Sequence, residues 1–249
     1  MQFTGKVAIV TGGAQGIGYG YAERLIEEGA SVAIVDIAAE KGEEAAARLS
    51  SKCGRAIFVK GDVSSEASMK EMAAEVAREL GGIDFLVNNA ALFGGMRLDG
   101  MLDIELDYYR RFMDINVHGA LLCIRACLPH MEGRAGAAIV NQTSTAAWMN
   151  YGLYSVAKLA LNGLTTSLAR ELGPRGIRIN GLAPGPTNTE ALGTSIDKAA
   201  LDALIATMPL SRIGTPADLA SGVVFLLSED ARWVTGHILN VDGGQFMRP

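Results

Sequence analysis

The sequence predicts an α/β protein built on a doubly wound parallel sheet, and three observations lead to this fold class. Short runs rich in β-branched apolar residues alternate with segments of helical periodicity along the chain. The helical segments stand between the strands, which requires parallel crossover connections. The strand runs are uniformly apolar, as expected for a sheet that helices cover on both faces. No proline-rich linker or shift in composition divides the chain, so we expect residues 1–249 to form a single domain.

The expected elements follow one another in a regular order. The first strand, 6–10, ends at the glycine-rich stretch TGGAQGIG, and the helix after it closes at Gly29. The strands expected next span 31–36, 55–62, 83–90, 137–144, 177–184 and 237–244. The helices expected between them span 39–50, 66–80, 105–131 and 154–172, with a loop at 91–103, and two more helices follow an irregular segment that ends near residue 197.

Composition and charge exclude several classes of function. The formal net charge of −5 is opposite in sign to what a phosphate backbone attracts, so we expect no nucleic-acid partner. No apolar run reaches the length of a membrane span, and the opening stretch MQFTGKVAIVTGG has no basic region followed by an apolar cleavage segment. We therefore expect a cytoplasmic protein that does not associate with membranes.

Disulfides and metal sites are not expected either. The three cysteines, Cys53, Cys123 and Cys127, form no paired framework, and no two of the three histidines have a metal-binding spacing. Cys123 and Cys127 lie four residues apart in an apolar helical stretch, where small buried core residues are the expected interpretation.

The turn after the first strand is suited to binding a diphosphate. Thr11, Gly12, Gly16 and Gly18 stand between a predicted strand and a predicted helix. Glycines there allow a tight turn and the close approach of a phosphate, while the helix offers unpaired N–H groups and a partial positive charge. The alternative is a turn that uses glycine only for its positive φ angles.

The second strand ends in Asp36, eighteen residues after Gly18. A carboxylate there accepts hydrogen bonds from an adenosine ribose, and it would repel a 2′-phosphate about 4 Å away by several kcal/mol at an effective dielectric near 20. Gln15 stands where a basic residue could have met that phosphate, so we expect NAD rather than NADP. Alternatively, Asp36 begins a turn or caps the next helix.

Polar residues also follow two later strands. Asp62-Val63 and Asn88-Asn89-Ala90 each come at the carboxyl end of a predicted strand. In an open parallel sheet, ligands bind at that edge, so polar residues gathered there are expected of a site.

The stretch YSVAK, 154–158, places a tyrosine and a lysine four residues apart. In a helix both side chains leave the same face, one turn apart. A phenol with a pKa near 10 is a poor base at neutral pH. Lys158 at about 5 Å would stabilise the phenolate by roughly 3 kcal/mol at an effective dielectric of 20, or about two pKa units, which would make Tyr154 a general acid/base.

Together these motifs resemble the short-chain dehydrogenases/reductases in their single-domain form. The match runs from TGGAQGIG through Asp62-Val63, NNAA, Asn116 in DINVHGA, Ser144 in IVNQTS, Tyr154, Lys158 and APGP to VDGG, and so spans the chain. The resemblance implies a Rossmann-like sheet of seven parallel strands, a nicotinamide cofactor and a catalytic tetrad of Asn116, Ser144, Tyr154 and Lys158. It commonly implies a homotetramer, with dimer contacts from the helices 105–131 and 154–172.

The resemblance also implies a role for each tetrad residue. Tyr154 would exchange a proton with the substrate oxygen as hydride passes to or from the nicotinamide, and Lys158 would also hold the nicotinamide ribose. Ser144 would hydrogen-bond the substrate oxygen, and Asn116 would support a water-mediated proton path. The alternative for Asn116 is a helix-interior residue that bends the helix or faces solvent.

The stretch APGPTNTE is placed by the resemblance beside the nicotinamide carboxamide, although an ordinary proline-bracketed turn is the alternative. The complete set of expected cofactor contacts is Gly12, Gln15, Gly16, Ile17, Gly18, Asp36, Asp62, Val63, Asn89, Ala90, Tyr154, Lys158, Pro184, Gly185 and Thr189.

Two departures from the family pattern stand out. Ala91 in NNAA replaces the usual glycine and adds a methyl group near the cofactor. The stretch between Ser144 and Tyr154 is shorter than in many members, which leaves Thr143 and Thr145 as alternatives to Ser144.

Substrate specificity is expected to reside in 91–103, 145–153 and 186–210, the last acting as a lid. These segments supply the apolar and aromatic side chains of Leu92, Phe93, Met96, Trp148, Met149, Tyr151, Leu153 and Leu192. Such a pocket favours a hydrophobic, cyclic or aromatic, secondary alcohol or ketone, and Met96-Arg97 leaves room for one anionic group. Alternatively, these residues pack an oligomer interface, and Tyr151 is a surface aromatic.

We therefore expect an NAD(H)-dependent oxidoreductase that interconverts a secondary alcohol and a ketone. One alternative is a 3-oxoacyl carrier-protein reductase, which would usually favour NADPH and present a basic docking patch. Another is a non-catalytic NAD-binding regulator, which would not need the acid/base pair. A sugar-nucleotide epimerase of the extended family would need more room than the short C-terminal portion leaves.

Overall fold

A parallel sheet of seven strands in the order β3-β2-β1-β4-β5-β6-β7 forms the centre of the computed structural model, which describes residues 1–51, 54–193 and 198–248. The strands are β1 Val7–Thr11, β2 Ser31–Asp36, β3 Ala56–Lys60, β4 Phe85–Asn88, β5 Ala138–Gln142, β6 Arg178–Pro184 and β7 Ile238–Val241. All six neighbouring pairs are parallel. The predicted Rossmann-like, doubly wound fold is confirmed. Cys53 and the 194–197 part of the expected lid lie outside the described residues.

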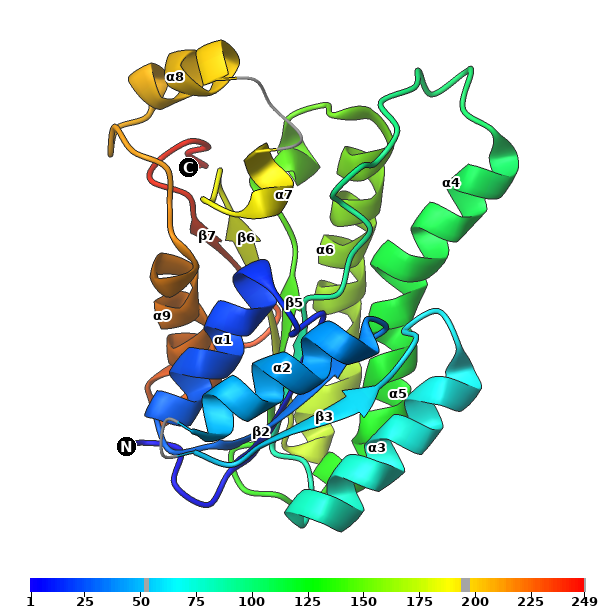
Figure 1. The fold of residues 1–249 in the computed structure, drawn as a ribbon, viewed down its shortest axis with the longest axis vertical. Helices are drawn as coiled ribbons and strands as arrows, with labels where there is room; N and C mark the ends of the chain where they lie inside the picture. Colours follow the sequence, from blue (N-terminus) through cyan, green and yellow to red (C-terminus); the bar gives the residue numbers. More distant parts are fainter. Residues whose placement is uncertain (52–53, 194–197, 249) are drawn as a thin grey trace.

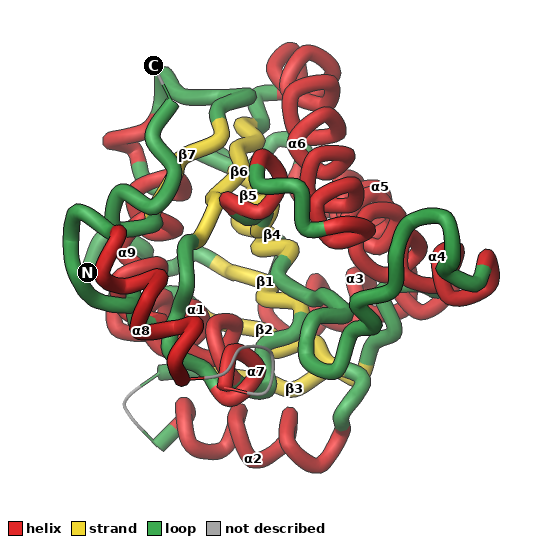
Figure 2. The backbone as a smooth tube through the Cα atoms, turned by 90° about the horizontal axis from the view of Figure 1, so that it is seen from above, coloured by secondary structure: helices red, strands yellow, loops and turns green. Residues whose placement is uncertain are grey.

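Helices cover both faces of this sheet (Figures 1 and 2). One face is covered by α1 Gly16–Glu27, α2 Ala39–Ser50 and α9 Pro216–Leu227, and the other by α3 Glu66–Leu80, α5 Gly119–Met131 and α6 Gly152–Leu172. Alternate strand residues therefore enter two separate cores: Val10 packs with α1 and α9, whereas Ile9 packs with α3 and α5. Among the described residues no helix is both long enough and apolar enough to span a membrane.

The expected single helix over 105–131 is wrong in detail. The segment divides into α4 Leu106–Met113, one π-helical stretch Asp114–His118 and α5. Asn116 lies in the π stretch, and its Nδ2 donates to the carbonyl of Phe112 at 2.9 Å. A side chain that competes for a backbone carbonyl loosens the regular helical ladder, which accounts for the wider turn. Helix α6 also begins at Gly152, two residues before its expected start.

A buried ion cluster joins β1 and β4 at the edge opposite the carboxyl ends of the strands. The side chain of Asp84 is 2% exposed and accepts hydrogen bonds from Val7 N, Lys6 Nζ and two nitrogens of Arg134. Burial alone would raise the pKa of Asp84, but the bonds from Arg134 and Val7 and the charge of Lys6 outweigh it and hold that pKa below its usual value.

Candidate active site

Segments far apart in the chain meet at the carboxyl edge of the sheet, the upper end in Figure 1. The 91–103 loop, the short helix α7 Glu190–Gly193, α8 Lys198–Thr207 and the C-terminal segment all lie there. The strand order reverses between β1 and β4, and in open α/β sheets ligands bind at such a point.

The glycine turn after β1 is pressed against the end of β4. Gly12 has φ +64°, and a Cβ there would lie 2.8 Å from Ala90 Cα; a Cβ on Gly18 would lie 2.2 Å from the Gly12 carbonyl oxygen. Asn89 Nδ2 donates to the carbonyls of Thr11 and Gly12, and Thr11 Oγ1 accepts from the N–H groups of Asn89 and Ala90. Asn89 and Thr11 thus hold the turn in shape.

The start of α1 leaves its N–H groups free for a ligand. The residue that precedes the helix, Gln15, makes no side-chain cap hydrogen bond. Gly16 has φ +59°, and the nearest neighbour of a Cβ built there is Thr189 Cγ2 at 4.0 Å, so the space beside it is open. Unpaired first-turn N–H groups beside open space are suited to binding an anion. Thr189 therefore lies next to this turn. The side chain of Ile17 packs against the core on the face of the sheet that α1, α2 and α9 cover.

Asp36 ends β2 beside the same turn. Its Oδ2 accepts from Ala14 N at 3.2 Å and its Oδ1 from Ala38 N at 3.1 Å, so the structural role considered as an alternative is present. Each carboxylate oxygen retains capacity for another donor. Lys41 of α2 donates to Oε1 of Gln15 at 2.8 Å. The lack of a basic residue at position 15 was the reason to expect NAD there, but Lys41 of α2 brings a positive charge to the same place. Gln15 therefore no longer supports a preference for NAD.

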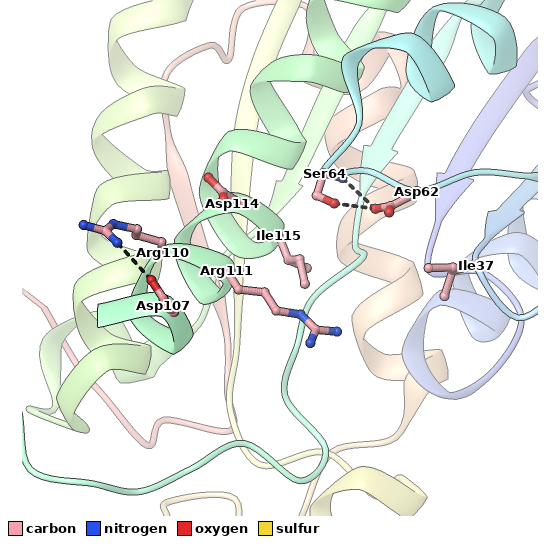
Figure 3. A pocket seen from close by; sticks show the side chains of 8 residues that line it. All are labelled: Ile37, Asp62, Ser64, Asp107, Arg110, Arg111, Asp114 and Ile115. Atoms are coloured by element: carbon pink, nitrogen blue, oxygen red, sulfur yellow. Dashed lines mark hydrogen bonds and ion pairs between the residues drawn. The ribbon is translucent and has the colours of Figure 1, made fainter. Parts of the chain in front are cut away.

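A pocket of about 350 Å³ lies next to this region (Figure 3). Its lining comes from Ile37, Asp62, Ser64, Asp107, Arg110, Arg111, Asp114 and Ile115. Arg111 extends across the pocket, whereas Arg110 pairs with Asp107 at 2.9 Å. Asp62 Oδ1 accepts from the amide and hydroxyl of Ser64. None of the four tetrad residues lines this pocket, so it belongs to the Asp36 end of the site.

The tyrosine and lysine of the YSVAK stretch lie on α6 and face the end of β5. Lys158 is 2% exposed, and its Nζ lies 5.7 Å from the centre of the Tyr154 ring and donates to the Gln142 carbonyl at 2.9 Å. Ser144 follows β5, and its hydroxyl lies close enough to the Tyr154 hydroxyl to lower the pKa of the phenol. The structure therefore brings Ser144, Tyr154 and Lys158 together.

Burial dominates the electrostatics of this group. It raises the pKa of Tyr154 to about 12, and the Ser144 hydroxyl acts in the opposite direction. It lowers the pKa of Lys158 to about 8. In the protein by itself the pKa of Tyr154 is therefore shifted in the direction opposite to that expected from Lys158, because loss of hydration disfavours the charged phenolate.

The two neighbours considered as alternatives to Ser144 are engaged elsewhere. Thr143 Oγ1 donates to the carbonyl of Leu182, and Thr145 Oγ1 bonds to the carbonyl of Pro184 and to Gln245 Oε1. Only Ser144 of the three reaches Tyr154, a choice that depended on the turn after β5 and could not be made from the sequence.

Asn116 faces a small internal cavity that it shares with Asn88 and Gln142. The Oδ1 atoms of Asn116 and Asn88 are buried and have no partner among the described residues. The cavity that Asn88 and Asn116 help to line has a volume of about 10 Å³, which is near the smallest volume that holds one water molecule. Lys158 donates to the carbonyl of Gln142, and Gln142 lines the cavity. Gln142 therefore connects the lysine to the cavity. Gln142 was missed from the sequence because it acts through its backbone carbonyl.

The expected substrate residues divide into two groups. Phe93 packs its ring 5.2 Å from that of Tyr154, and Leu92, Met96 and Leu153 belong to the apolar cluster around the same tyrosine. Trp148 instead packs on the C-terminal segment, where it stacks on Phe246.

Two further expectations about this region are affected. The guanidinium of Arg97 pairs with Asp99 and Glu105, so an anionic group on the substrate would compete with these two carboxylates. Tyr151 is 55% exposed, as a surface aromatic would be. The described part of the chain holds no cluster of three or more metal-ligating side chains.

Comparisons with known proteins find similarity along almost the whole chain. Residues 12–245 match a family model described as enoyl-(acyl carrier protein) reductase. An uncharacterized oxidoreductase of Mycobacterium tuberculosis is 52% identical, with 99% of each chain covered. A 2,5-dichloro-2,5-cyclohexadiene-1,4-diol dehydrogenase of Sphingobium indicum is 37% identical over 97% of each chain, and a 3α-hydroxysteroid dehydrogenase of Mediterraneibacter gnavus is 35% identical over 98% of each. Among solved structures, a short-chain dehydrogenase from Burkholderia cenocepacia in complex with NADP superposes with a TM-score of 0.89 at 34% identity, covering 98% of this chain and 99% of that one.

Proposed function

Because the chain belongs to the short-chain dehydrogenase/reductase family of oxidoreductases, which bind a nicotinamide cofactor, we propose that it interconverts a secondary alcohol and a ketone with NAD(H). The observation that carries this proposal is that Tyr154 lies beside Ser144 and Lys158 at the same sheet edge as an open helix N-terminus. Acid/base and anion-binding groups that converge in this way are suited to proton transfer coupled to hydride transfer.

The residues at the turn fit a dinucleotide. The free N–H groups at the start of α1 and the open space at Gly16 would take the diphosphate, and Asp36 would accept from the adenosine ribose. The adenine would then enter the pocket beside Asp62, which begins at Ile37, the next residue after Asp36. Thr189, next to Gly16, would contact the nicotinamide end.

The chain's own residues would handle the proton. The bound nicotinamide accepts or supplies the hydride. Tyr154 would take the proton of the alcohol, or return one to the ketone oxygen, while Ser144 holds that oxygen by a hydrogen bond. Lys158 stabilises the phenolate form, and the positive charge of an oxidised nicotinamide acts in the same direction on the raised pKa of Tyr154. A water between Asn116 and Asn88 would extend the proton path from Lys158 through the small cavity.

The preference for NAD rests on Asp36. A 2′-phosphate would meet its carboxylate, although Lys41 lies close enough to Gln15 to offset part of the repulsion. The Burkholderia relative is described with NADP, so a dual cofactor preference is the specific alternative.

The substrate class follows from the surroundings of Tyr154. Phe93, Leu92 and Met96 present an aromatic and aliphatic surface to the phenol, and Arg97 is already paired with carboxylates. Such a surface favours a hydrophobic cyclic or aromatic alcohol. Two of the relatives are named for steroid and cyclohexadiene-diol substrates, which are of this kind.

The exposed apolar side chains support a homotetramer. Val156 and Leu159 on α6 are 40% and 52% exposed, and on another part of the surface Phe225 and Trp233 are 41% and 97% exposed. Two separate apolar surfaces match the two kinds of interface that a tetramer with dihedral symmetry needs. Light scattering coupled to size-exclusion chromatography would measure the mass.

A spectrophotometric screen tests the function. Purified protein would be offered NAD and NADP with a panel of aromatic, alicyclic, steroid and acyl-thioester alcohols. NAD-dependent turnover of a cyclic or aromatic alcohol is expected. NADPH-only reduction of a 3-oxoacyl thioester would support the carrier-protein reductase, and cofactor binding without turnover on any alcohol would favour a regulator.

A further inference from the structure

The C-terminal segment 242–248 lies against the short turn that follows Ser144. The ring of Trp148 stacks on Phe246 at 5.6 Å between centroids and 12° between planes. The guanidinium of Arg248 lies 3.9 Å from the centre of the Trp148 ring. A stacked aromatic ring and a cation–π contact each stabilise the position of an indole, and both act on Trp148.

A polar contact joins the same two segments closer to the catalytic residues. Thr145 Oγ1, next to Ser144, bonds to Gln245 Oε1 at 2.9 Å, across a hundred residues of sequence. Arg248 is fixed in turn, because its Nη2 donates to the Ile238 carbonyl at 2.7 Å and to Asn240 Oδ1 at 3.0 Å on β7. The turn 145–148 is thereby connected, through the C-terminal segment 242–248, to β7 at the edge of the sheet.

The tail also contacts the end of the lid. Leu210 N donates to the Gly243 carbonyl at 3.1 Å, and a Cβ on Gly244 would lie 2.7 Å from Pro209 Cγ. The carboxylate of Asp242 accepts from the N–H groups of Gly244 and Phe246, which shapes the segment into a tight bend. The same few residues therefore contact two of the three segments expected to form the substrate site.

We propose that the C-terminal segment 242–248 positions Ser144 for catalysis by clamping Trp148 and Thr145, so that Phe246 and Arg248 are positioning residues of the active site. The proposal rests on the proposed function, in which Ser144 holds the substrate oxygen. Ser144 opens the 3₁₀ turn Thr145–Trp148, and its Oγ accepts from Ala146 N at 3.1 Å. A shift of Trp148 at one end of this single turn moves the hydroxyl at the other, and displacement of a catalytic group by about 1 Å can lower turnover by about a hundredfold.

The tryptophan content offers a test that does not depend on activity. The chain has two tryptophans, and Trp233 is 97% exposed, so Trp233→Phe leaves Trp148 as the only indole. In this background Phe246→Ala and Arg248→Ala are compared with Phe246→Tyr, which keeps the stacked ring. Met247→Ala is the matched control, because Met247 lies between them and is 78% exposed. Acrylamide quenching of Trp148, kcat, KM and the Kd for NADH are measured for each variant.

Phe246→Ala is expected to increase quenching of Trp148 and to lower kcat about tenfold or more, while the Kd for NADH stays within about twofold. Phe246→Tyr should retain activity and Met247→Ala should match the parent. Unchanged quenching in Phe246→Ala and Arg248→Ala would overturn the clamp, and increased quenching with unchanged kcat would overturn the positioning of Ser144. A parent that binds NADH but turns over no alcohol would instead overturn the proposed function.

Discussion

The two halves of the site are held in place by different means. On the β1–β4 side, the glycine turn is held by bonds between the backbone and the Asn89 and Thr11 side chains, and it packs so closely that a Cβ at Gly12 or Gly18 would overlap its neighbours. On the β5–β7 side, the turn 145–148 that follows Ser144 is held by side chains from α6 and from the C-terminal segment. A turn whose glycines leave no room for a Cβ tolerates little variation, whereas a surface held by exchangeable side chains can be reshaped without disturbing the sheet. Cofactor binding and substrate choice can therefore vary separately.

Loss of the Tyr154 hydroxyl should lower turnover and leave cofactor binding nearly unchanged. Tyr154→Phe removes the acid/base group, which typically contributes about 10² to 10⁴ in rate, so kcat should fall by that factor. The Kd for NADH, measured by fluorescence titration, should stay within a few-fold because the glycine turn is untouched. Tyr151→Phe is the matched control, since Tyr151 is 55% exposed on the same turn. Substantial activity in Tyr154→Phe would refute the mechanism.

Removal of the buried carboxylate should weaken the whole fold and leave the site chemistry intact. Asp84→Ala leaves Arg134 and Lys6 without their buried partner, at the edge of the sheet opposite the site, and should lower the free energy of unfolding by about 3 kcal/mol. Because the pKa of Asp84 is lowered in the folded state, this contribution should be present at neutral pH and lost as pH falls through that lowered pKa.

Urea unfolding between pH 3 and pH 7 measures the effect of Asp84, with kcat per folded molecule as the second readout. Asp107→Ala is the control, because it removes an ion pair whose carboxylate side chain is 96% exposed. A difference between wild type and Asp84→Ala that did not narrow in acid would contradict the proposed role of the carboxylate.

The buried lysine should affect the free energy of unfolding in the alkaline range, and at neutral pH it should destabilise the fold, whereas Asp84 stabilises it. The pKa of Lys158 is lowered from 10.5 to about 8, so below pH 8 the folded protein holds a charged, poorly hydrated ammonium. Between about pH 8 and 10.5 the unfolded chain binds more protons than the folded one, so stability from this group rises with pH by roughly 3 kcal/mol in all. The free energy of unfolding of Lys158→Met, measured by urea titration, should therefore exceed that of wild type by the largest amount at pH 7. This difference should disappear by pH 10.5. A constant difference across this range would show that the lysine is not perturbed.

Cofactor preference should respond to single residues on the β1–β4 side by smaller factors. Asp36→Ala should lower the ratio of the Kd for NADP to the Kd for NAD by about tenfold, because it removes a carboxylate near the 2′ position. Lys41→Ala should change the same ratio in the opposite direction by a smaller factor, and Lys70→Ala, on an exposed pair of α3, should change neither constant. If Asp36→Ala leaves the ratio unchanged, another residue sets the preference.

Much of this site could be predicted from the sequence because it depends on local spacing. The alternation of short apolar runs with segments of helical periodicity predicted the strands. It also predicted that helices cover both faces of the sheet. The glycine turn, Asp36 at the end of β2 and the four-residue spacing of Tyr154 and Lys158 are all properties of short stretches, and the structure places them at one sheet edge.

Only the tertiary structure decided which groups meet across long stretches of chain and how deeply they are buried. It selected Ser144 over its threonine neighbours, turned Trp148 onto the tail, brought Lys41 to Gln15 and widened the helix at Asn116. Burial also raises the pKa of Tyr154, the reverse of the direction expected from its lysine alone. Such outcomes depend on packing between remote segments and on hydration of the assembled site, and neither is encoded in the spacing of neighbouring residues.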